Sequence, residues 1–165
     1  MPPGKKPPAI DKAALKAELV AHLARALDQA RAAHASAVEG ATHEEARPEN
    51  DKDTRGLEQS YLARGQAQRV AELEAAVADA TALALRAFTP RDPVGMGAAV
   101  TIDEDGDERV YFVAPHGGGT VLAGGVQVVT PSSPLGRALS GKRVDDEAEV
   151  DLRGRKRTLA IVALA

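Results

Sequence analysis

One stretch of fourteen residues, Val129–Lys142, decides the fold and reads VTPSSPLGRALSGK. Ser133 is placed to cap a helix, and Pro134 follows at the first helical position, where its fixed φ and missing N–H cost little. Three residues give the helix an apolar side: Leu135, Ala138 and Leu139. Gly141 suits the helix stop, because glycine accepts positive φ. The stretch therefore predicts a short capped helix between β-strands.

The rest of the chain has two unlike halves. Residues 1–90 hold 24 of the 33 alanines and four glycines, whereas residues 91–165 hold the other 11 glycines. This difference favours a helical first half and a β-rich second half. With four aromatic residues in 165, neither half can build a large core, and an elongated helical region is expected.

Composition also narrows the functional classes. The chain has no cysteine, which excludes disulfides and thiolate metal sites, and a net charge of −3 gives no footprint for wrapping nucleic acid. It has no signal-peptide pattern and no long apolar run. We therefore expect a cytoplasmic monomer whose partner is a protein.

Residues 10–90 show the spacing of an antiparallel coiled-coil hairpin, after a disordered tail at residues 1–9. The first apolar series runs from Leu15 and Leu19 to Ala37, and the second comprises Leu57, Tyr61, Val70, Leu73, Val77, Ala80 and Ala84. Pro48 breaks the helix between the two series. Folding there brings Leu15 level with Ala84, and the second helix is expected to end near Thr89.

Residues 91–165 change to short apolar runs separated by turns. Strands are predicted at 98–102, 109–114, 120–123, 126–130, 147–152 and 157–164. Asp105-Gly106 and Arg153-Gly154 are two-residue hairpin signals. The predicted class is therefore α+β, with a helical hairpin followed by a small antiparallel sheet that carries one short helix.

Acidic residues gather where the hairpin should turn. Seven lie between residues 39 and 58, against three basic ones, and five of the seven fall near the tip at 44–53: Glu44, Glu45, Glu49, Asp51 and Asp53. One interpretation is a solvated helix start, since acids near a helix N-terminus interact favourably with its dipole. The other is a Mg²⁺ site, because magnesium prefers carboxylate oxygen ligands and can activate water toward a phosphodiester.

Taken together, the serine-proline helix, the hairpin and the acidic tip resemble the Gre transcript cleavage factors across about residues 10–165. The resemblance implies an FKBP-like sheet domain at 91–165 that docks on bacterial RNA polymerase through the segment Ser132, Ser133, Pro134 and Leu135. It also implies that the hairpin enters the secondary channel, where tip acids near the RNA 3′ end help to hold a Mg²⁺ ion shared with the polymerase. The hydrolysis would then be the polymerase's own reaction, stimulated by this chain.

The family's two tip acids stand three residues apart, and the second is followed by asparagine. Glu49-Asn50 matches that second acid, but Ala46 stands where the first is expected, so Glu45 or Glu44 would have to replace it. Glu45 and Glu49 are the first candidates, followed by Glu44, Asp51 and Asp53. A factor without the complete pair could instead block the channel and inhibit the polymerase.

Two further hypotheses are weaker. Prolyl isomerase activity needs several convergent aromatic rings, whereas Tyr111 and Phe112 are adjacent in one strand and point to opposite faces. A purely structural coiled-coil adaptor would not need its acids at the tip. The basic cluster Arg153, Arg155, Lys156 and Arg157 on a hairpin turn is either solvated or in contact with an acidic polymerase surface.

Overall fold

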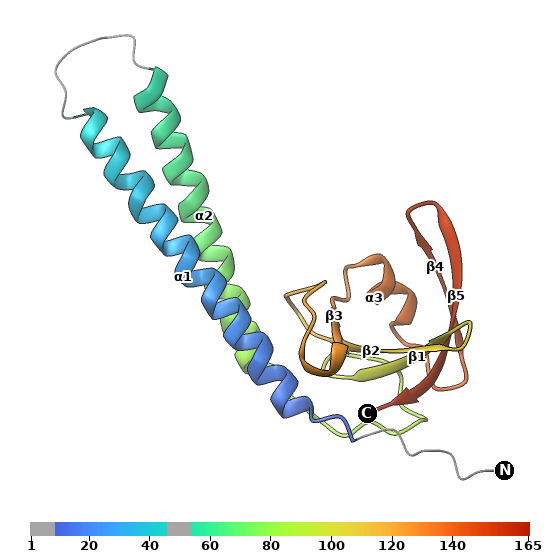
Figure 1. The fold of residues 1–165 in the computed structure, drawn as a ribbon. Coiled ribbons are helices and arrows are strands. Elements are labelled where there is room, and N and C mark those ends of the chain that lie inside the picture. Colours follow the sequence, from blue (N-terminus) through green and yellow to red (C-terminus); the bar gives the residue numbers. More distant parts are fainter. Residues whose placement is uncertain (1–8, 46–53) are drawn as a thin grey trace. The chain divides into compact units, whose positions relative to one another are not determined.

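The computed structural model describes residues 9–45 and 54–165. These residues form two compact units, Val20–Asp79 and a second unit that combines the chain up to Leu19 with Ala80–Ala165. Figure 1 shows two long helices followed by a small sheet with one short helix. This arrangement confirms the predicted α+β class.

The helices are α1 (Lys12–Glu45) and α2 (Thr54–Ala82), and they run antiparallel. Within one unit, the Lys16 Nζ donates to the Leu83 carbonyl at 2.8 Å. Within the other, Arg31 pairs with Glu74 at 2.9 Å. Low-numbered residues of α1 thus face high-numbered residues of α2, in agreement with the predicted hairpin.

Helix α2 ends at Ala82, so the prediction that it continues to near Thr89 is wrong. The reason is Phe88, which is buried in the core of the sheet domain. Lys12 and Arg86 lie over its ring, at 4.8 and 3.8 Å from the centroid. Residues 83–89 therefore lie outside the helix. This non-helical segment places Phe88 in the core.

The predicted seam is correct at Leu73 and Ala80 but wrong at Leu57, Tyr61 and Ala84, which are exposed. The exposed fractions of Leu57 and Tyr61 are 59% and 61%. Side chains three or four residues apart share a helix face. Counting back from Leu73 by such steps reaches Gln66 and then Ala63 and Gln59, which are partly buried. Leu57 and Tyr61 are out of phase with this series, so they face solvent.

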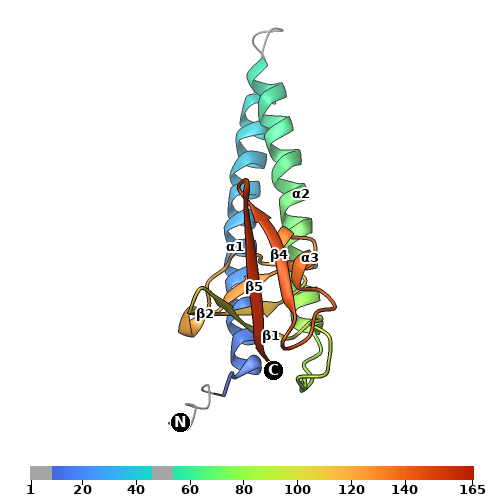
Figure 2. The same cartoon turned by 90° about the vertical axis from the view of Figure 1, so that its right-hand side faces the viewer.

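Within the described residues, five strands form one sheet in the order β3-β2-β1-β5-β4. Figure 2 shows β4 and β5 side by side as a hairpin. Their bounds are β1 Ala99–Glu104, β2 Asp107–Val113, β3 Gln127–Val129, β4 Glu147–Leu152 and β5 Arg155–Leu164. Neighbouring strands are antiparallel except β2 and β3, which are parallel, so the sheet is mixed and the wholly antiparallel expectation is corrected at β3. The predicted strand at 120–123 is also absent. Val121 makes a single bridge to Gln127, and Ala123–Gly125 is a 3-10 turn.

Both predicted two-residue turns are present. Asp105 and Gly106 have φ values of 55° and 90°, and Arg153 and Gly154 have values of 57° and 77°. Positive φ at both central residues is the geometry of a type I′ turn, which fits the twist of the flanking strands. The two turns fix the β1–β2 and β4–β5 hairpins, whose registers set which side chains share each face.

Candidate functional site

The serine-proline helix is α3 (Pro134–Leu139), and its cap forms as predicted. The Ser133 Oγ accepts a hydrogen bond from the Gly136 N–H at 3.0 Å and donates one to the Thr130 carbonyl at 2.8 Å. Gly141 follows the helix with φ 77°. A single hydroxyl therefore ties the helix start to the end of β3, which fixes the position of the whole segment.

Gly136 is a structural residue that the sequence reading missed. An ideal Cβ at this position would lie 1.8 Å from the Thr130 carbonyl oxygen, far inside contact distance. Only glycine allows α3 to approach the β3 end this closely. Glycine has a poor helix propensity, so its presence inside this six-residue helix could have indicated a close approach of the backbone to a neighbouring segment.

A cleft of about 440 Å³ lies beside α3. Ser133, Pro134 and Leu135 line one side, so three of the four predicted docking residues are brought together there. Strands β2, β4 and β5 contribute Arg109, Tyr111, Leu152 and Arg157. Ser132 is exposed outside the lining, and its carbonyl accepts from Arg137 at 2.6 Å.

Only one of the two adjacent aromatic residues reaches the cleft. Tyr111 lines it, whereas Phe112 is fully buried and is not part of the lining. Strand alternation predicted this division. The domain therefore offers the cleft one aromatic ring.

A second, larger hollow of about 950 Å³ lies between the β1–β2 and β4–β5 turns. Glu104 and Asp105 lie on one side of it and the predicted basic cluster on the other. The Arg157 Nε pairs with the Glu104 Oε1 at 2.9 Å. Arg157 and Leu152 belong to both the cleft and the hollow, so the two surfaces are continuous.

Two ionisable groups, Lys12 at the start of α1 and Asp92 in the loop after α2, have displaced pKa values. Partial burial and the Arg86 guanidinium lower the pKa of Lys12, whose ammonium donates to the Arg86 carbonyl. The Thr89 N–H and hydroxyl both donate to the Asp92 carboxylate, at 2.7 and 2.9 Å, and lower its pKa. These contacts fix the loop that carries Phe88, and their role is structural.

The predicted tip acids cannot be assembled into a site from the described residues. Glu44 and Glu45 are the last two residues of α1, and Glu49, Asp51 and Asp53 lie outside the described residues. Within residues 9–45 and 54–165, no group of three or more acidic or histidine side chains could hold a metal ion. In the same part of the chain, no helix is long and apolar enough to cross a membrane. The tip site stays a prediction.

The fold defines a helical-hairpin protein with a C-terminal mixed sheet and a cleft beside a capped helix. Residues 89–165 match the family described as transcription elongation factor, GreA/GreB, C-terminal. Residues 89–165 are therefore similar to the C-terminal domain of this Gre-type family.

Two curated relatives are the transcription elongation factors GreA of Brucella canis and Brucella suis. Each is 38% identical over 98 residues, covering 58% of this chain and 60% of the relative. The match thus spans less than two thirds of the relatives' length.

Similar solved structures include GreA factor homolog 1 of Thermus thermophilus, at 21% identity over 90% of this chain and 95% of that one, with a TM-score of 0.38. Gfh1 of Thermus aquaticus is 23% identical over 90% and 94% of the two chains, with a TM-score of 0.40.

Proposed function

We propose that this chain is a transcription elongation regulator that binds bacterial RNA polymerase through residues 91–165 and inserts its hairpin tip into the secondary channel. The observation that carries the proposal is the match of residues 89–165 to the GreA/GreB C-terminal domain. Names of curated relatives support it, since they are called transcription elongation factors. The proposed role is that of a monomer acting in the cytoplasm.

The tip would act through its carboxylates near the RNA 3′ end. Carboxylate oxygens are ligands that Mg²⁺ prefers, so the donor set at residues 44–53 fits this ion. Glu45 and Glu49 would hold it first, with Glu44, Asp51 and Asp53 nearby. When bound, the ion supplies an activated water for phosphodiester hydrolysis in backtracked complexes.

A second candidate is inhibition by blocking the channel, and Ala46 favours it. This alanine stands where the family pattern has its first tip acid. Magnesium demands near-ideal ligand geometry and tolerates displaced ligands poorly. Without a competent pair, the hairpin would occupy the channel and slow nucleotide addition.

A cleavage assay on stalled, backtracked elongation complexes separates the two candidates. If the tip stimulates cleavage, Glu45→Ala and Glu49→Ala should each abolish release of short 3′ RNA fragments while binding is kept. The double variant should then be no worse than either single one, because the shared ion is lost in each case. Glu58→Ala, an exposed acid beyond the tip range, is the matched control.

Channel blocking predicts a different result. Wild type should release no fragments at any magnesium concentration and should slow elongation, and neutralising the tip should relieve that inhibition. If the full-length protein shows no association with polymerase in a pull-down, both candidates are wrong.

A further inference from the structure

The β4–β5 hairpin and β2 carry a group of cationic side chains that we call the basic rim: Arg109, Arg153, Arg155, Lys156 and Arg157. All five are exposed. Arg157 pairs with Glu104. Among the described residues, none forms an ion pair with the other four cations. The rim therefore carries positive charge that the fold itself does not neutralise.

Strand register directs much of this charge toward the cleft. Arg109 lies opposite Ile102, Arg157 opposite Val150 and Arg155 opposite Leu152. Ile102 and Val150 belong to the core on the cleft side of the sheet, and Leu152 packs against it. Because directly paired residues share a face, the three arginines lie on that side too.

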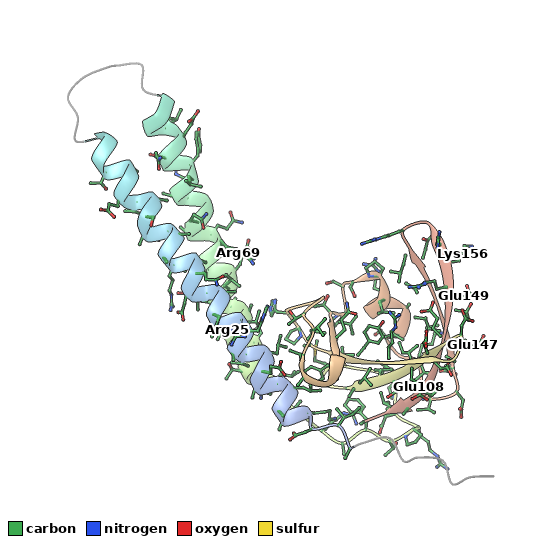
Figure 3. The ribbon with its side chains drawn as sticks, in the orientation of Figure 1. Arg25, Arg69, Glu108, Glu147, Glu149 and Lys156 are labelled. Carbon is green, nitrogen blue, oxygen red and sulfur yellow. The ribbon has the colours of Figure 1, made fainter. Side chains whose placement is uncertain are left out.

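Most acidic side chains of the same strands lie on the other face; the exception is Asp107, which shares the face of Arg109 at the start of β2. Glu147 and Glu149 alternate along β4 with buried Ala148 and Val150, and Glu108 precedes Arg109 in β2. Figure 3 shows Glu108, Glu147 and Glu149 on the strands of this sheet. Lys156, opposite Asp151, is the one rim cation in a strand that shares their face. Alternation therefore separates most of the charges, and Arg109, Arg155 and Arg157 lie on the cleft side.

Apolar side chains form part of the cleft lining. Tyr111, Leu135 and Leu152 are partly buried and pack against the core, which fixes their positions. A volume of about 440 Å³ leaves room for side chains of another molecule. Apolar side chains beside Arg109 and Arg155, which have no ion-pair partner among the described residues, are complementary to a segment that combines an apolar side chain with carboxylates.

We propose that the cleft binds an acidic segment of the polymerase surface, which seats an apolar anchor on Tyr111, Leu135 and Leu152 and directs carboxylates to Arg109 and Arg155. The inference rests on the proposed function and deepens it by stating the chemistry of the partner. A protein segment fits better than a nucleic acid strand, because strand binding relies on several aromatic rings for base stacking and this cleft has one.

The test measures association and dissociation rates of the full-length protein with core RNA polymerase at several salt concentrations. Arg109→Glu and Arg155→Glu should each lower the association rate about 3- to 10-fold and weaken its salt dependence, since rim charges act mainly on encounter. Arg91→Glu is the matched control, an exposed arginine outside the cleft lining, and should match wild type.

Leu135→Ala should instead raise the dissociation rate about tenfold, as expected for an anchor contact. Leu135 also packs against the core, so the thermal midpoint of the Leu135→Ala variant must be measured to detect any loss of folding stability. Arg109 and Arg155 are exposed, so their substitution should not affect folding stability in this way. The two arginine variants therefore decide whether the proposal is correct.

Each remaining outcome has a distinct meaning. Wild-type rates and salt dependence in both arginine variants would overturn the inference and leave the proposed function standing. Loss of binding to a single-stranded RNA oligonucleotide, with polymerase binding unchanged, would assign the rim to nucleic acid instead. Absence of polymerase binding by wild type itself would remove the proposed function and the inference together.

Discussion

The sheet domain around α3 and the tip end of the hairpin are packed in opposite ways. In the sheet domain, large aliphatic side chains such as Ile102 and Ile161 are almost fully buried, and Gly136 has no room for a methyl group. At the tip end of α2, the large side chains of Leu57 and Tyr61 face solvent. The partly buried positions of the seam in this part of α2 are Gln66, Ala63 and Gln59.

This difference shows where the chain's stability lies. Burial stabilises by about 25 cal/mol per Å² of apolar surface, so a seam of alanine and glutamine contributes little. Segments with few buried apolar contacts open at low free energy. We therefore expect substitutions at the tip end to cost little stability and substitutions around α3 to cost the most. Substitutions in the leucine part of the seam should have an intermediate cost.

The largest effect is expected for Gly136→Ala. Its Cβ would collide with the Thr130 carbonyl, so α3 or the β3 end must move, and unfolding free energy should fall by about 3 kcal/mol or more. Gly65→Ala is the matched control, because a Cβ there meets nothing within 4 Å and alanine favours helix by about 1 kcal/mol. Chemical denaturation should give shifts of opposite sign, and equal shifts would contradict the contrast.

Leu27→Ala should have the next largest effect. Leu27 packs with Ala30 and Leu73 in the leucine part of the seam, and a buried leucine-to-alanine change costs about 2–5 kcal/mol. Amide hydrogen exchange should show faster opening in Val20–Asp79 than in the sheet domain. Unchanged exchange rates around Leu73 would mean that this cluster does not hold the helices together.

A smaller effect is expected on acidification. Hydrogen bonds from Thr89 hold the pKa of Asp92 below its ordinary value of 3.8. A lowered pKa adds stability that is present above the ordinary value and is lost as pH falls through the folded value. Thermal midpoints of wild type and Asp92→Asn should therefore converge in strong acid. Parallel curves at all pH values would exclude this contribution.

The smallest effect is expected for Tyr61→Ala. With an exposed fraction of 61%, the side chain lies mostly in solvent, and the unfolding free energy should change by no more than about 0.5 kcal/mol. Thermal denaturation of the full-length protein measures this. A loss comparable to that of Leu27→Ala would restore Tyr61 to the seam and abolish the contrast.

Local signals predicted much of this fold. The Ser133 cap and the two type I′ turns depend on residues a few positions apart, and all are present. The predicted bounds 147–152 are those of β4. The phase of the α2 seam was wrong at Leu57 and Tyr61, because two phases competed near Gly65 and apolar content alone favoured the wrong one.

The candidate site was predictable only in part. The segment Ser133–Leu135 was chosen from its motif, and the structure places it on a cleft. Arg109 was not predicted from the sequence. Nothing near it in the chain indicates that it lines the same cleft as Leu152 and Arg157. The predicted roles of Glu45 and Glu49 remain predictions.

The sequence by itself determined the caps, the turns and the alternation of strand faces, because each follows from backbone geometry and interactions between near neighbours. Only the tertiary structure decided the parallel pairing of β3, the exit of Phe88 from the α2 helix and the convergence of distant arginines on one cleft. These features depend on which surfaces can be buried together. That choice is made between residues far apart in the chain, where local pattern carries no information.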